Sequence, residues 1–280
     1  MNLFITGASG FVGTNLLNNK NFLNKFKKVY CLTRKKKVSN SKKIIWIKGN
    51  LNSNLNKYFK KTDFLLHMAA HSANKPYDNL DNCIKWNCLI SRKLINNAYK
   101  LGVKNFLILG TYFEYGFAGQ FFKNKKVSVT DFCLPMSTYA LSKSFFFQSL
   151  FSWSLGKSVS IKYLRLPHVF GEGELESRLW PQIKSDKLDK IVLDNPKFKT
   201  NFINIQKFIK KLSYLINIKK FKKNTFEITN ITDKEMFLYD FAISEKKKLK
   251  SKINILKLKN KKKLFQFLLP KKENIQIKIK

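Results

Sequence analysis

The sequence predicts an α/β protein built on a doubly wound, mostly parallel sheet, with a smaller region at its C-terminal end. Two observations lead to this prediction. Short apolar runs alternate with helical patterns over roughly the first 170 residues, as in repeated strand-helix-strand units. The chain has 280 residues and is 44% hydrophobic, which is too apolar for disorder and sufficient for one large core or two modest ones.

Apolar runs predict the strands, in chain order, at Asn2–Thr6, Lys28–Thr33, Ile44–Ile47, Phe64–His67, Phe106–Leu109 and Ile161–Leu166. Helical spacing of apolar residues predicts helices over Phe11–Leu17, Asn82–Leu101 and Tyr139–Leu155. After residue 171 the alternation weakens: 172–200 has the composition of loops, and 201–216 fits one more strand and helix. We therefore expect a cofactor domain over 1–170, with 201–216 returning to it, and a smaller substrate-binding region over 171–280.

The net charge is 55 − 17 = +38, a value that ordinarily points to nucleic acid or an anionic membrane surface. Here 51 of the 55 basic residues are Lys, spread through every segment, as a coding bias toward A/T-rich codons would produce. We expect no nucleic-acid partner and no membrane partner, and we expect the lysine runs at 246–248 and 261–263 to be solvated. Only Arg34, Arg92, Arg165 and Arg178 are arginines, and each is a candidate for bidentate binding that Lys cannot provide.

Cysteine and histidine usage predicts a protein without a metal site. The four cysteines form no CxxC pair, and the three histidines share no ligand spacing with them. Free thiols in a reducing compartment are the simple interpretation. The N-terminus has no basic segment followed by a cleavable apolar stretch, and no apolar run approaches the ~18 residues of a membrane span. We expect a cytoplasmic protein.

The sharpest local motif is the glycine-rich segment Thr6-Gly7-Ala8-Ser9-Gly10-Phe11-Val12-Gly13, between the first strand and the first helix. Glycines at such a loop let backbone N–H groups approach a pyrophosphate at the helix N-terminus. A turn that merely connects two elements is the alternative. The position between strand and helix favours cofactor binding, with Gly7, Gly10, Phe11, Val12 and Gly13 in contact with a dinucleotide.

The second strand ends at Thr33, where a ribose-binding acid would identify an NAD site. The residues there are Arg34 and three lysines, with no Asp or Glu. An Arg at this place accommodates the 2′-phosphate of NADP, so the sequence favours NADP, with NAD possible. The carboxyl ends of the third and fourth strands, where open α/β sheets bind ligands, add further cofactor candidates: Asn50, Leu51, Met68, Ala69 and Ala70.

Tyr139 and Lys143 stand four residues apart on a predicted helix, which places them on one face. A nearby ammonium stabilises phenolate, so we expect Lys143 to lower the pKa of Tyr139 toward neutrality. Such a tyrosine can exchange a proton with an alcohol or ketone while a nicotinamide exchanges hydride. Thr111, after the strand Phe106–Leu109, offers a hydroxyl partner.

Together these motifs resemble the extended short-chain dehydrogenases/reductases of the NAD-dependent epimerase/dehydratase family, Rossmann-fold enzymes that act mostly on nucleotide-activated sugars. The matching segments occur in order: TGxxGxxG at Thr6–Gly13, HMAA at His67–Ala70, Asn87, the Thr111 segment, Tyr139 with Lys143, and Arg165–Gly171. The resemblance implies that Tyr139 is the acid/base, that Lys143 holds Tyr139 and the nicotinamide ribose, and that Thr111 hydrogen-bonds the reacting oxygen. It also implies that Asn87 belongs to the cofactor site and that Pro167 and His168 line the nicotinamide end; for His168, a satisfied buried histidine is the alternative.

The segment after Thr111 narrows the reaction. The family's dehydratases usually follow this threonine with Asp-Glu, whereas Tyr112 and Phe113 stand here, which argues against 4,6-dehydration. The Gly-Thr-x-x-Glu-Tyr-Gly form resembles sugar 4-ketoreductases of the CDP-abequose synthase type. The first alternative is a nucleotide-sugar 4-epimerase with tightly bound NAD. The second is a catalytically silent nucleotide-sensing or RNA-associated module, which the intact Thr111, Tyr139 and Lys143 disfavour.

Two expectations concern partners. The segment around Arg178 and Trp180 resembles the family's substrate loop, where an arginine meets the diphosphate and an aromatic ring stacks on the base; an ordinary surface loop is the alternative. The helix after Lys143 is more apolar than one core-facing stripe requires, with Phe145, Phe146, Phe147, Leu150, Phe151 and Trp153. With the resemblance, this predicts a homodimer in which this helix and the helix of Asn87 pair across a twofold axis.

Overall fold

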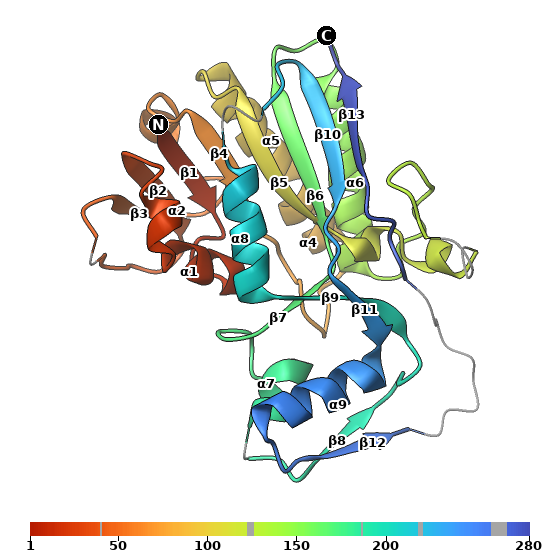
Figure 1. The fold of residues 1–280 in the computed structure, drawn as a ribbon. Coiled ribbons are helices and arrows are strands. Elements are labelled where there is room, and N and C mark those ends of the chain that lie inside the picture. Colours follow the sequence, from red (N-terminus) through yellow and green to blue (C-terminus); the bar gives the residue numbers. More distant parts are fainter. Residues whose placement is uncertain (40, 122–125, 186, 218–220, 259–267) are drawn as a thin grey trace.

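The computed structural model describes residues 1–39, 41–121, 126–185, 187–217, 221–258 and 268–280. Its main sheet has eight strands in the order β13-β10-β6-β5-β4-β1-β2-β3 (Figure 1). Every neighbouring pair is parallel except β13, which runs antiparallel to β10. The doubly wound parallel sheet predicted from the sequence is therefore confirmed. The strands are β1 (Asn2–Thr6), β2 (Lys28–Thr33), β3 (Ile44–Lys48), β4 (Phe64–His67), β5 (Asn105–Thr111), β6 (Ser160–Leu166), β10 (Thr225–Asn230) and β13 (Asn274–Lys278).

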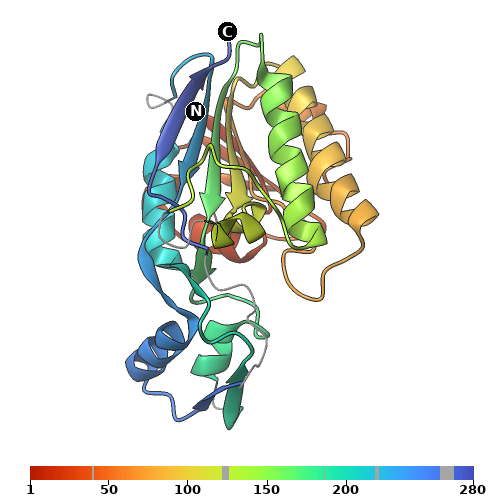
Figure 2. The same cartoon turned by 90° about the vertical axis from the view of Figure 1, so that its right-hand side faces the viewer.

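Helices cover both faces of this sheet, as Figure 2 shows for α6 and α8 on opposite sides. One face carries α1 (Phe11–Leu17), α2 (Lys20–Leu23) and α8 (Ile205–Leu215). The other carries α3 (Asn56–Phe59), α4 (Leu80–Ile84), a π-helical turn (Lys85–Ile90), α5 (Ser91–Lys100) and α6 (Thr138–Ser154). Between β5 and α6 lie two 3₁₀ turns, Tyr112–Glu114 and Phe117–Gln120.

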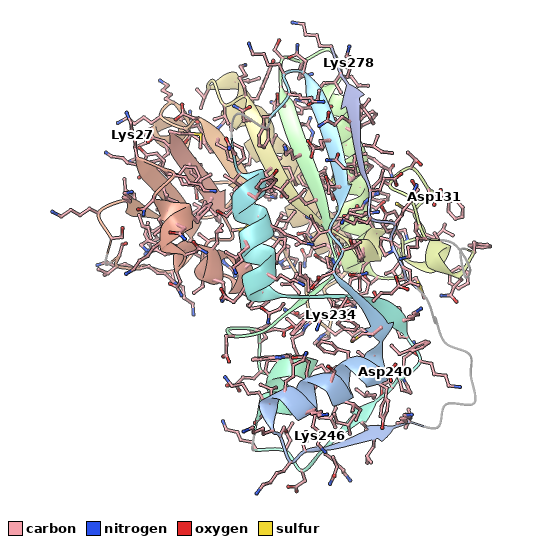
Figure 3. The ribbon with its side chains drawn as sticks, in the orientation of Figure 1. Lys27, Asp131, Lys234, Asp240, Lys246 and Lys278 are labelled. Atoms are coloured by element: carbon pink, nitrogen blue, oxygen red, sulfur yellow. The ribbon has the colours of Figure 1, made fainter. Side chains whose placement is uncertain are left out.

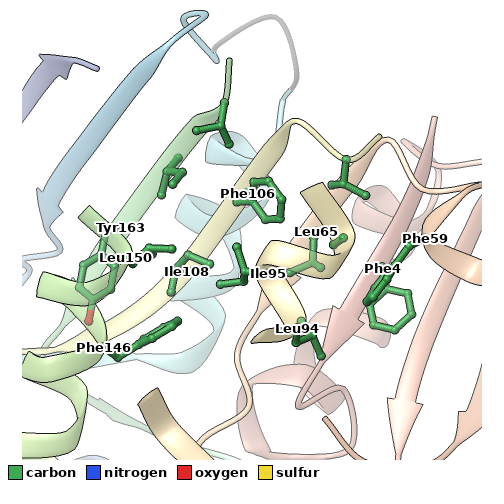
Figure 4. Close-up of a cluster of buried hydrophobic side chains, with 14 of the residues drawn as sticks. Phe4, Phe59, Leu65, Leu94, Ile95, Phe106, Ile108, Phe146, Leu150 and Tyr163 are labelled. Carbon is green, nitrogen blue, oxygen red and sulfur yellow. The ribbon is translucent and has the colours of Figure 1, made fainter. Parts of the chain in front are cut away.

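The core on the α6 side explains why these segments fold against the sheet. Phe106 and Ile108 are two residues apart in β5 and lie on the same face of the strand. They pack in one cluster with Ile95 of α5 and Phe146 of α6, and all four side chains are fully buried (Figure 4). The period of two in the strand and the helical spacing in α5 and α6 direct these side chains into one layer. This packing fixes α6, and with it the helical face that carries Tyr139, against the sheet.

A smaller lobe lies below the carboxyl end of the main sheet (Figure 1). It contains β7 (His168–Phe170), α7 (Leu179–Lys184), β8 (Lys190–Leu193), β9 (Lys199–Asn204), β11 (Lys234–Phe237), α9 (Leu238–Leu249) and β12 (Asn254–Lys257). Its strands form a three-stranded sheet, β11-β9-β7, and a two-stranded sheet, β12-β8. The lobe has apolar cores of its own, built around α7 and α9.

The second half of the chain differs from the expected division. Residues 172–200, expected to be loops, include α7 and β8. Of the segment 201–216, only α8 returns to the main sheet, because β9 pairs with β7 and β11 in the small lobe. The strands β10 and β13 also join the main sheet, so α8 and β10 interrupt the small lobe once and β13 follows it. Phe226 and Ile228 of β10 are buried in the main core. Ile275 and Ile277, on one face of the edge strand β13, pack against this core. A strand with polar residues at alternate positions is tolerated at this edge because only one of its faces must be apolar.

The positive charge is not gathered on one face. Lys27, Lys234, Lys246 and Lys278 lie at widely separated places on the molecule (Figure 3). The lysines at 246–248 occupy the last turn of α9, where cations interact favourably with the helix dipole; the second run, 261–263, lies outside the described residues. Within the described ranges, no helix is long and apolar enough to cross a membrane, and no group of three His, Cys, Asp or Glu side chains could hold a metal.

Candidate active site

The glycine loop between β1 and α1 is closely packed against the loop after β4. Gly7 has φ +72°, and a Cβ there would lie 2.7 Å from the backbone nitrogen of Ala69. A Cβ on Gly13 would lie 2.4 Å from the carbonyl oxygen of Gly7. Gly10 is the N-cap of α1, so no side chain covers the first turn of the helix. This cradle, which any larger residue would fill, fits the close approach of a pyrophosphate predicted from the sequence.

Thr6 connects the same loop to the end of β4. Its Oγ1 accepts hydrogen bonds from the backbone N–H groups of Met68 and Ala69, both at 3.2 Å, and lies 2.9 Å from Nδ1 of His67. Burial, together with the charge of the neighbouring Lys143, lowers the pKa of His67 to about 3, so this imidazole is neutral. The predicted residues Met68, Ala69 and Ala70 thus follow directly on a strand end that Thr6 holds against the glycine loop.

The other predicted dinucleotide contacts lie at the carboxyl ends of β2 and β3. Arg34 is exposed just after β2. Asn50 and Leu51 follow β3, with Leu51 packed against the main core. Because β1, β2 and β3 are adjacent and parallel, their carboxyl ends lie at one edge of the sheet. Arg34, Asn50 and Leu51 are brought together at this edge, called here the adenosine end of the proposed cofactor site.

Asn87 lies in the π-helical turn Lys85–Ile90 and is buried. Its side-chain oxygen accepts a hydrogen bond from the backbone N–H of His71 at 2.6 Å, and its Nδ2 donates to the carbonyl oxygen of His71 and to Oγ of Ser142. The widened turn, a feature often found at functional sites, places Asn87 between the loop after β4 and α6. Asn87 therefore orders the site from within the protein.

The structure brings the three predicted catalytic residues to one place, at the end of β5 and the start of α6. Tyr139 and Lys143 lie one turn apart on α6, and both are buried. Nζ of Lys143 donates to the carbonyl oxygen of Leu109 at 2.8 Å. Thr111 is the last residue of β5, and its Oγ1 accepts from the backbone N–H of Phe113 at 3.3 Å, capping the turn that follows.

The electrostatics differ from the expectation for Tyr139. Burial raises the pKa of Tyr139, the negative charge of Glu114 and the Tyr77 phenol raise it further, and only Arg178 acts to lower it. Burial also lowers the pKa of Lys143, to about 8, against the opposing effect of Glu114. The expected lowering of the Tyr139 pKa by Lys143 was therefore wrong for this arrangement, because burial and Glu114 raise that pKa and Lys143 is not among the groups that act on it. Tyr139 is held as a phenol that can donate a proton.

Pro167 and His168 follow β6 beside this site. His168 stacks on Phe202, with ring centroids 5.3 Å apart, and meets the edge of Phe113. Burial, together with Arg178, lowers its pKa to about 3, so the ring is neutral. Its Nε2 is buried without a hydrogen-bond partner among the described residues. A satisfied core histidine would not leave this atom unpaired, which favours the functional interpretation.

The two predicted substrate residues, Arg178 and Trp180, lie in different surroundings. Arg178 lies on the approach to the site: its charge acts on Tyr77, Tyr139 and His168, and Glu174 holds its Nε at 3.2 Å. Trp180 is only 7% exposed and packs in the small lobe, where its indole N–H donates to Glu245. It has little free surface on which a base could stack, because the helix α7 turns it inward. The structure makes Trp180 an anchor of the small lobe instead.

Tyr77 is a site residue that the sequence did not indicate. Its ring stacks on Tyr139, with centroids 6.1 Å apart and planes 13° apart. Burial raises the pKa of Tyr77, and Arg178 and Ser137, the N-cap of α6, act to lower it. Thr138 donates to the carbonyl oxygen of Asp78 and so fastens this loop to α6. Only the position of Tyr77 ten residues after β4 could have suggested it, and that position is in a loop without a pattern.

The predicted dimer face is less apolar than the sequence suggested. Phe146 and Leu150 are buried in the main core, and Phe147, Phe151 and Trp153 pack against it. Phe145 remains 40% exposed, and Leu89, on the neighbouring helical segment, is 62% exposed. The pairing of these helices in a homodimer stays a prediction.

Comparison with solved structures shows the same fold in nucleotide-sugar enzymes. MoeE5 in complex with UDP-glucuronic acid and NAD is 16% identical, covering 97% of this chain and 90% of its own, with a TM-score of 0.79. DesIV, a dTDP-glucose 4,6-dehydratase from Streptomyces venezuelae with NAD bound, is 15% identical over 97% and 88% of the two chains, with a TM-score of 0.80. A UDP-glucuronic acid 4-epimerase from Bacillus cereus, in complex with NAD, is 18% identical over 97% and 90%, with a TM-score of 0.79.

No curated protein matches the chain by sequence. The model of the NAD dependent epimerase/dehydratase family, however, matches residues 3–228, from the first strand through the glycine cradle, the Thr111, Tyr139 and Lys143 cluster and on to β10. Most of the chain is covered by this match, and the chain accordingly belongs to the NAD-dependent epimerase/dehydratase family.

Proposed function

We propose that this chain reduces a keto group, at C4, of a nucleotide-linked sugar, with NADPH preferred as hydride donor. The observation that carries the proposal is Tyr139, buried beside Thr111 and Lys143 and held as a phenol. A buried phenol is a proton donor over the whole physiological pH range, which suits net reduction of a ketone. The family assignment supplies the substrate class and the nicotinamide.

The residues after Thr111 support reduction over dehydration. Tyr112 is buried and its hydroxyl donates to the carbonyl oxygen of Ile231, while Phe113 packs edge-on against His168. Neither side chain can exchange protons with a sugar, since one is a phenol committed to a backbone oxygen and the other is apolar. The two positions where related dehydratases carry an acid and a base are thus filled by packing residues.

The chain offers a consistent set of cofactor contacts. The cradle of Gly7, Gly10 and Gly13 would hold the pyrophosphate at the start of α1, and Arg34 would meet a 2′-phosphate. Lys143 would hold the nicotinamide ribose, and the unpaired Nε2 of His168 would face the nicotinamide end. When bound, the reduced nicotinamide supplies the hydride.

The protein's part in the reaction is to bind the carbonyl and deliver a proton. The hydroxyl groups of Thr111 and Tyr139 would hydrogen-bond the carbonyl oxygen, drawing electron density from the carbon that accepts hydride. Tyr139 then gives its phenolic proton to that oxygen, and the Lys143 ammonium stabilises the phenolate that remains. Arg178, at the approach to the site, would bind the substrate diphosphate, a geometry that guanidinium suits better than ammonium.

The proposal is tested with purified protein, NADPH or NADH, and nucleotide-linked 4-keto sugars generated in situ by a 4,6-dehydratase. We expect oxidation of NADPH at 340 nm that depends on the keto sugar, with NADPH preferred over NADH. Consumption of neither cofactor with any 4-keto sugar would contradict it. Nicotinamide retained through purification, together with interconversion of sugars without net cofactor use, would identify a 4-epimerase.

A further inference from the structure

A buried ion pair lies beside the proposed site that neither the proposed chemistry nor the cofactor cradle uses. Glu114 and Arg165 are 0% and 1% exposed, and Nε of Arg165 donates to Oε2 of Glu114 at 2.9 Å. Nη1 of Arg165 donates to the Tyr115 hydroxyl at 2.8 Å and to the carbonyl oxygen of Val129 at 3.2 Å. An ion pair this deeply buried costs desolvation energy that a pair of apolar residues would avoid. Its position therefore calls for a functional explanation.

The other oxygen of Glu114 reaches the residues of the site. Oε1 accepts from the backbone N–H of Thr111 and from the Tyr163 hydroxyl, each at 2.8 Å. Gly110 makes room for this arrangement, because a Cβ there would lie 2.6 Å from Oε1 and 2.3 Å from the ring of Tyr163. One residue earlier, the carbonyl oxygen of Leu109 holds Nζ of Lys143. Glu114 is thus hydrogen-bonded to the backbone of Thr111, two residues beyond the carbonyl group that holds Lys143.

From these contacts we infer that Glu114 is a positioning residue of the proposed reductase: its carboxylate fixes the end of β5, where Thr111 stands and where the carbonyl oxygen of Leu109 holds Lys143. The inference rests on the proposed function and deepens it. It assigns the order of this strand end to one fully buried carboxylate, whose charge adds to the effect of burial on Tyr139.

The charges around the site agree with this role. Glu114 raises the pKa of Tyr139 and of Lys143, so in each case it favours the protonated form. Among the described residues, Glu114, Tyr77 and Arg178 act on Tyr139, and Tyr139 itself acts on Tyr163. Glu114 and Cys88 act on Lys143, which also faces His67. The groups that surround Glu114 are Arg165, Tyr115, Tyr163 and Cys133. Arg165 is not among the groups that act on Tyr139 or Lys143.

A second buried pair in the same sheet provides a matched control. Lys162 and Glu227 are 6% and 3% exposed, 3.2 Å apart, and bridge β6 and β10. Asn274 and Gln276 of β13 complete the hydrogen bonds of Glu227. Glu227→Gln and Glu114→Gln each remove the negative charge of a buried pair, but only Glu114 is hydrogen-bonded to a residue of the site.

The experiment compares wild type, Glu114→Gln and Glu227→Gln by two measurements. The first is the pH dependence of keto-sugar reduction with NADPH. The second, which needs no substrate, is tyrosinate absorbance at 295 nm during an alkaline titration, with the same titration of a Tyr139→Phe partner subtracted to isolate Tyr139. In Glu114→Gln we expect the alkaline limb of the rate and the onset of Tyr139 ionisation to move about one pH unit lower, the small end of the range for loss of a nearby like charge.

In Glu227→Gln we expect the alkaline limb of the rate and the onset of Tyr139 ionisation to stay within about 0.2 pH unit of wild type. The variants Glu114→Gln and Glu227→Gln should both be less stable than wild type. Because Glu114→Gln leaves Arg165 buried and unpaired, Glu114→Gln/Arg165→Met is tested beside it; the same downward shift is expected. Wild-type behaviour of Tyr139 in both Glu114 variants, or an equal shift in Glu227→Gln, would overturn the inference. If wild type reduces no keto sugar, the proposed function fails, while the Tyr139 titration still decides the role of Glu114.

Discussion

The two ends of the proposed cofactor site are built in opposite ways. At the end where the reaction would occur, called here the chemical end, Tyr139 and Lys143 are buried. Lys143 is hydrogen-bonded to the sheet, and the backbone of Thr111 is hydrogen-bonded to Glu114. At the adenosine end, Arg34 lies exposed after β2, beside three exposed lysines. One end fixes ionisable groups inside the protein, and the other presents charge to solvent.

The difference follows from what each end must do. Proton transfer requires groups of defined position and ionisation, and only a dry, packed environment sets both. Discrimination between NADP and NAD requires one charge within reach of a phosphate, and a flexible cation at the surface can provide it. Substitutions at the chemical end should therefore change rate and pH dependence, whereas those at the adenosine end should change affinity.

The largest effect is expected for Tyr139→Phe. Removing the proton donor should lower the rate of reduction by about 10²–10⁴-fold and leave NADPH affinity unchanged, since no phosphate contact is lost. Steady-state kinetics measure the rate of reduction, and fluorescence titration with NADPH measures the affinity for the cofactor. Tyr58→Phe, on α3 and half-buried against the main core, serves as control. Retention of full activity would remove the enzyme assignment.

Arg34→Ala should show the opposite pattern. If the guanidinium binds the 2′-phosphate, NADPH binding weakens by about 1.5–3 kcal/mol, the range for a hydrogen bond to a charged group, while NADH binding and the maximal rate change little. Binding titrations with both cofactors measure this, with Lys36→Ala as the neighbouring control. Equal losses for NADPH and NADH would assign the site to NAD.

The ionisation of Lys143 predicts a pH dependence of intermediate size. Burial lowers its pKa to about 8, so the ammonium is present below that pH and is lost as the pH rises through it. Reduction should fall about tenfold for each pH unit above this point. Lys143→Arg stays charged, and whatever activity it keeps should lack this alkaline limb; a limb at the same pH in the variant would assign it to another group.

The smallest effect should come from Glu174→Gln, which removes the charge of the 8%-exposed carboxylate that pairs with Arg178. Because the Arg178 side chain is itself 35% exposed and water can solvate the guanidinium, the loss of this pair should cost about 1 kcal/mol or less. KM for the nucleotide sugar should therefore change by less than about fivefold, with kcat unchanged. By contrast, Arg178→Gln should raise KM by about tenfold or more. If Glu174→Gln changes kcat as strongly as Tyr139→Phe, the division between binding and chemical ends is wrong.

Much of this molecule could be predicted from local patterns. The glycine loop after β1, the apolar runs of β1 to β6 and the Tyr139–Lys143 spacing each lie within a few consecutive residues, and the structure has them where the sequence places them. The return of β10 and β13 was not predicted, because strand pairing depends on contacts between segments more than 40 residues apart. The inward turn of Trp180 likewise depends on its distant partner Glu245.

By itself, the sequence determined the fold class and the phosphate-binding loop, since glycine content and periodicity are local properties of the chain. The three catalytic candidates came from the spacing of Tyr139 and Lys143 and from the resemblance to a known family. Only the tertiary structure decided the protonation of the site. Whether Tyr139 is a phenol or a phenolate depends on how deeply it is buried and on Glu114, Tyr77 and Arg178, which come from other segments. Desolvation and charge act through space, so their balance exists only once the chain has folded.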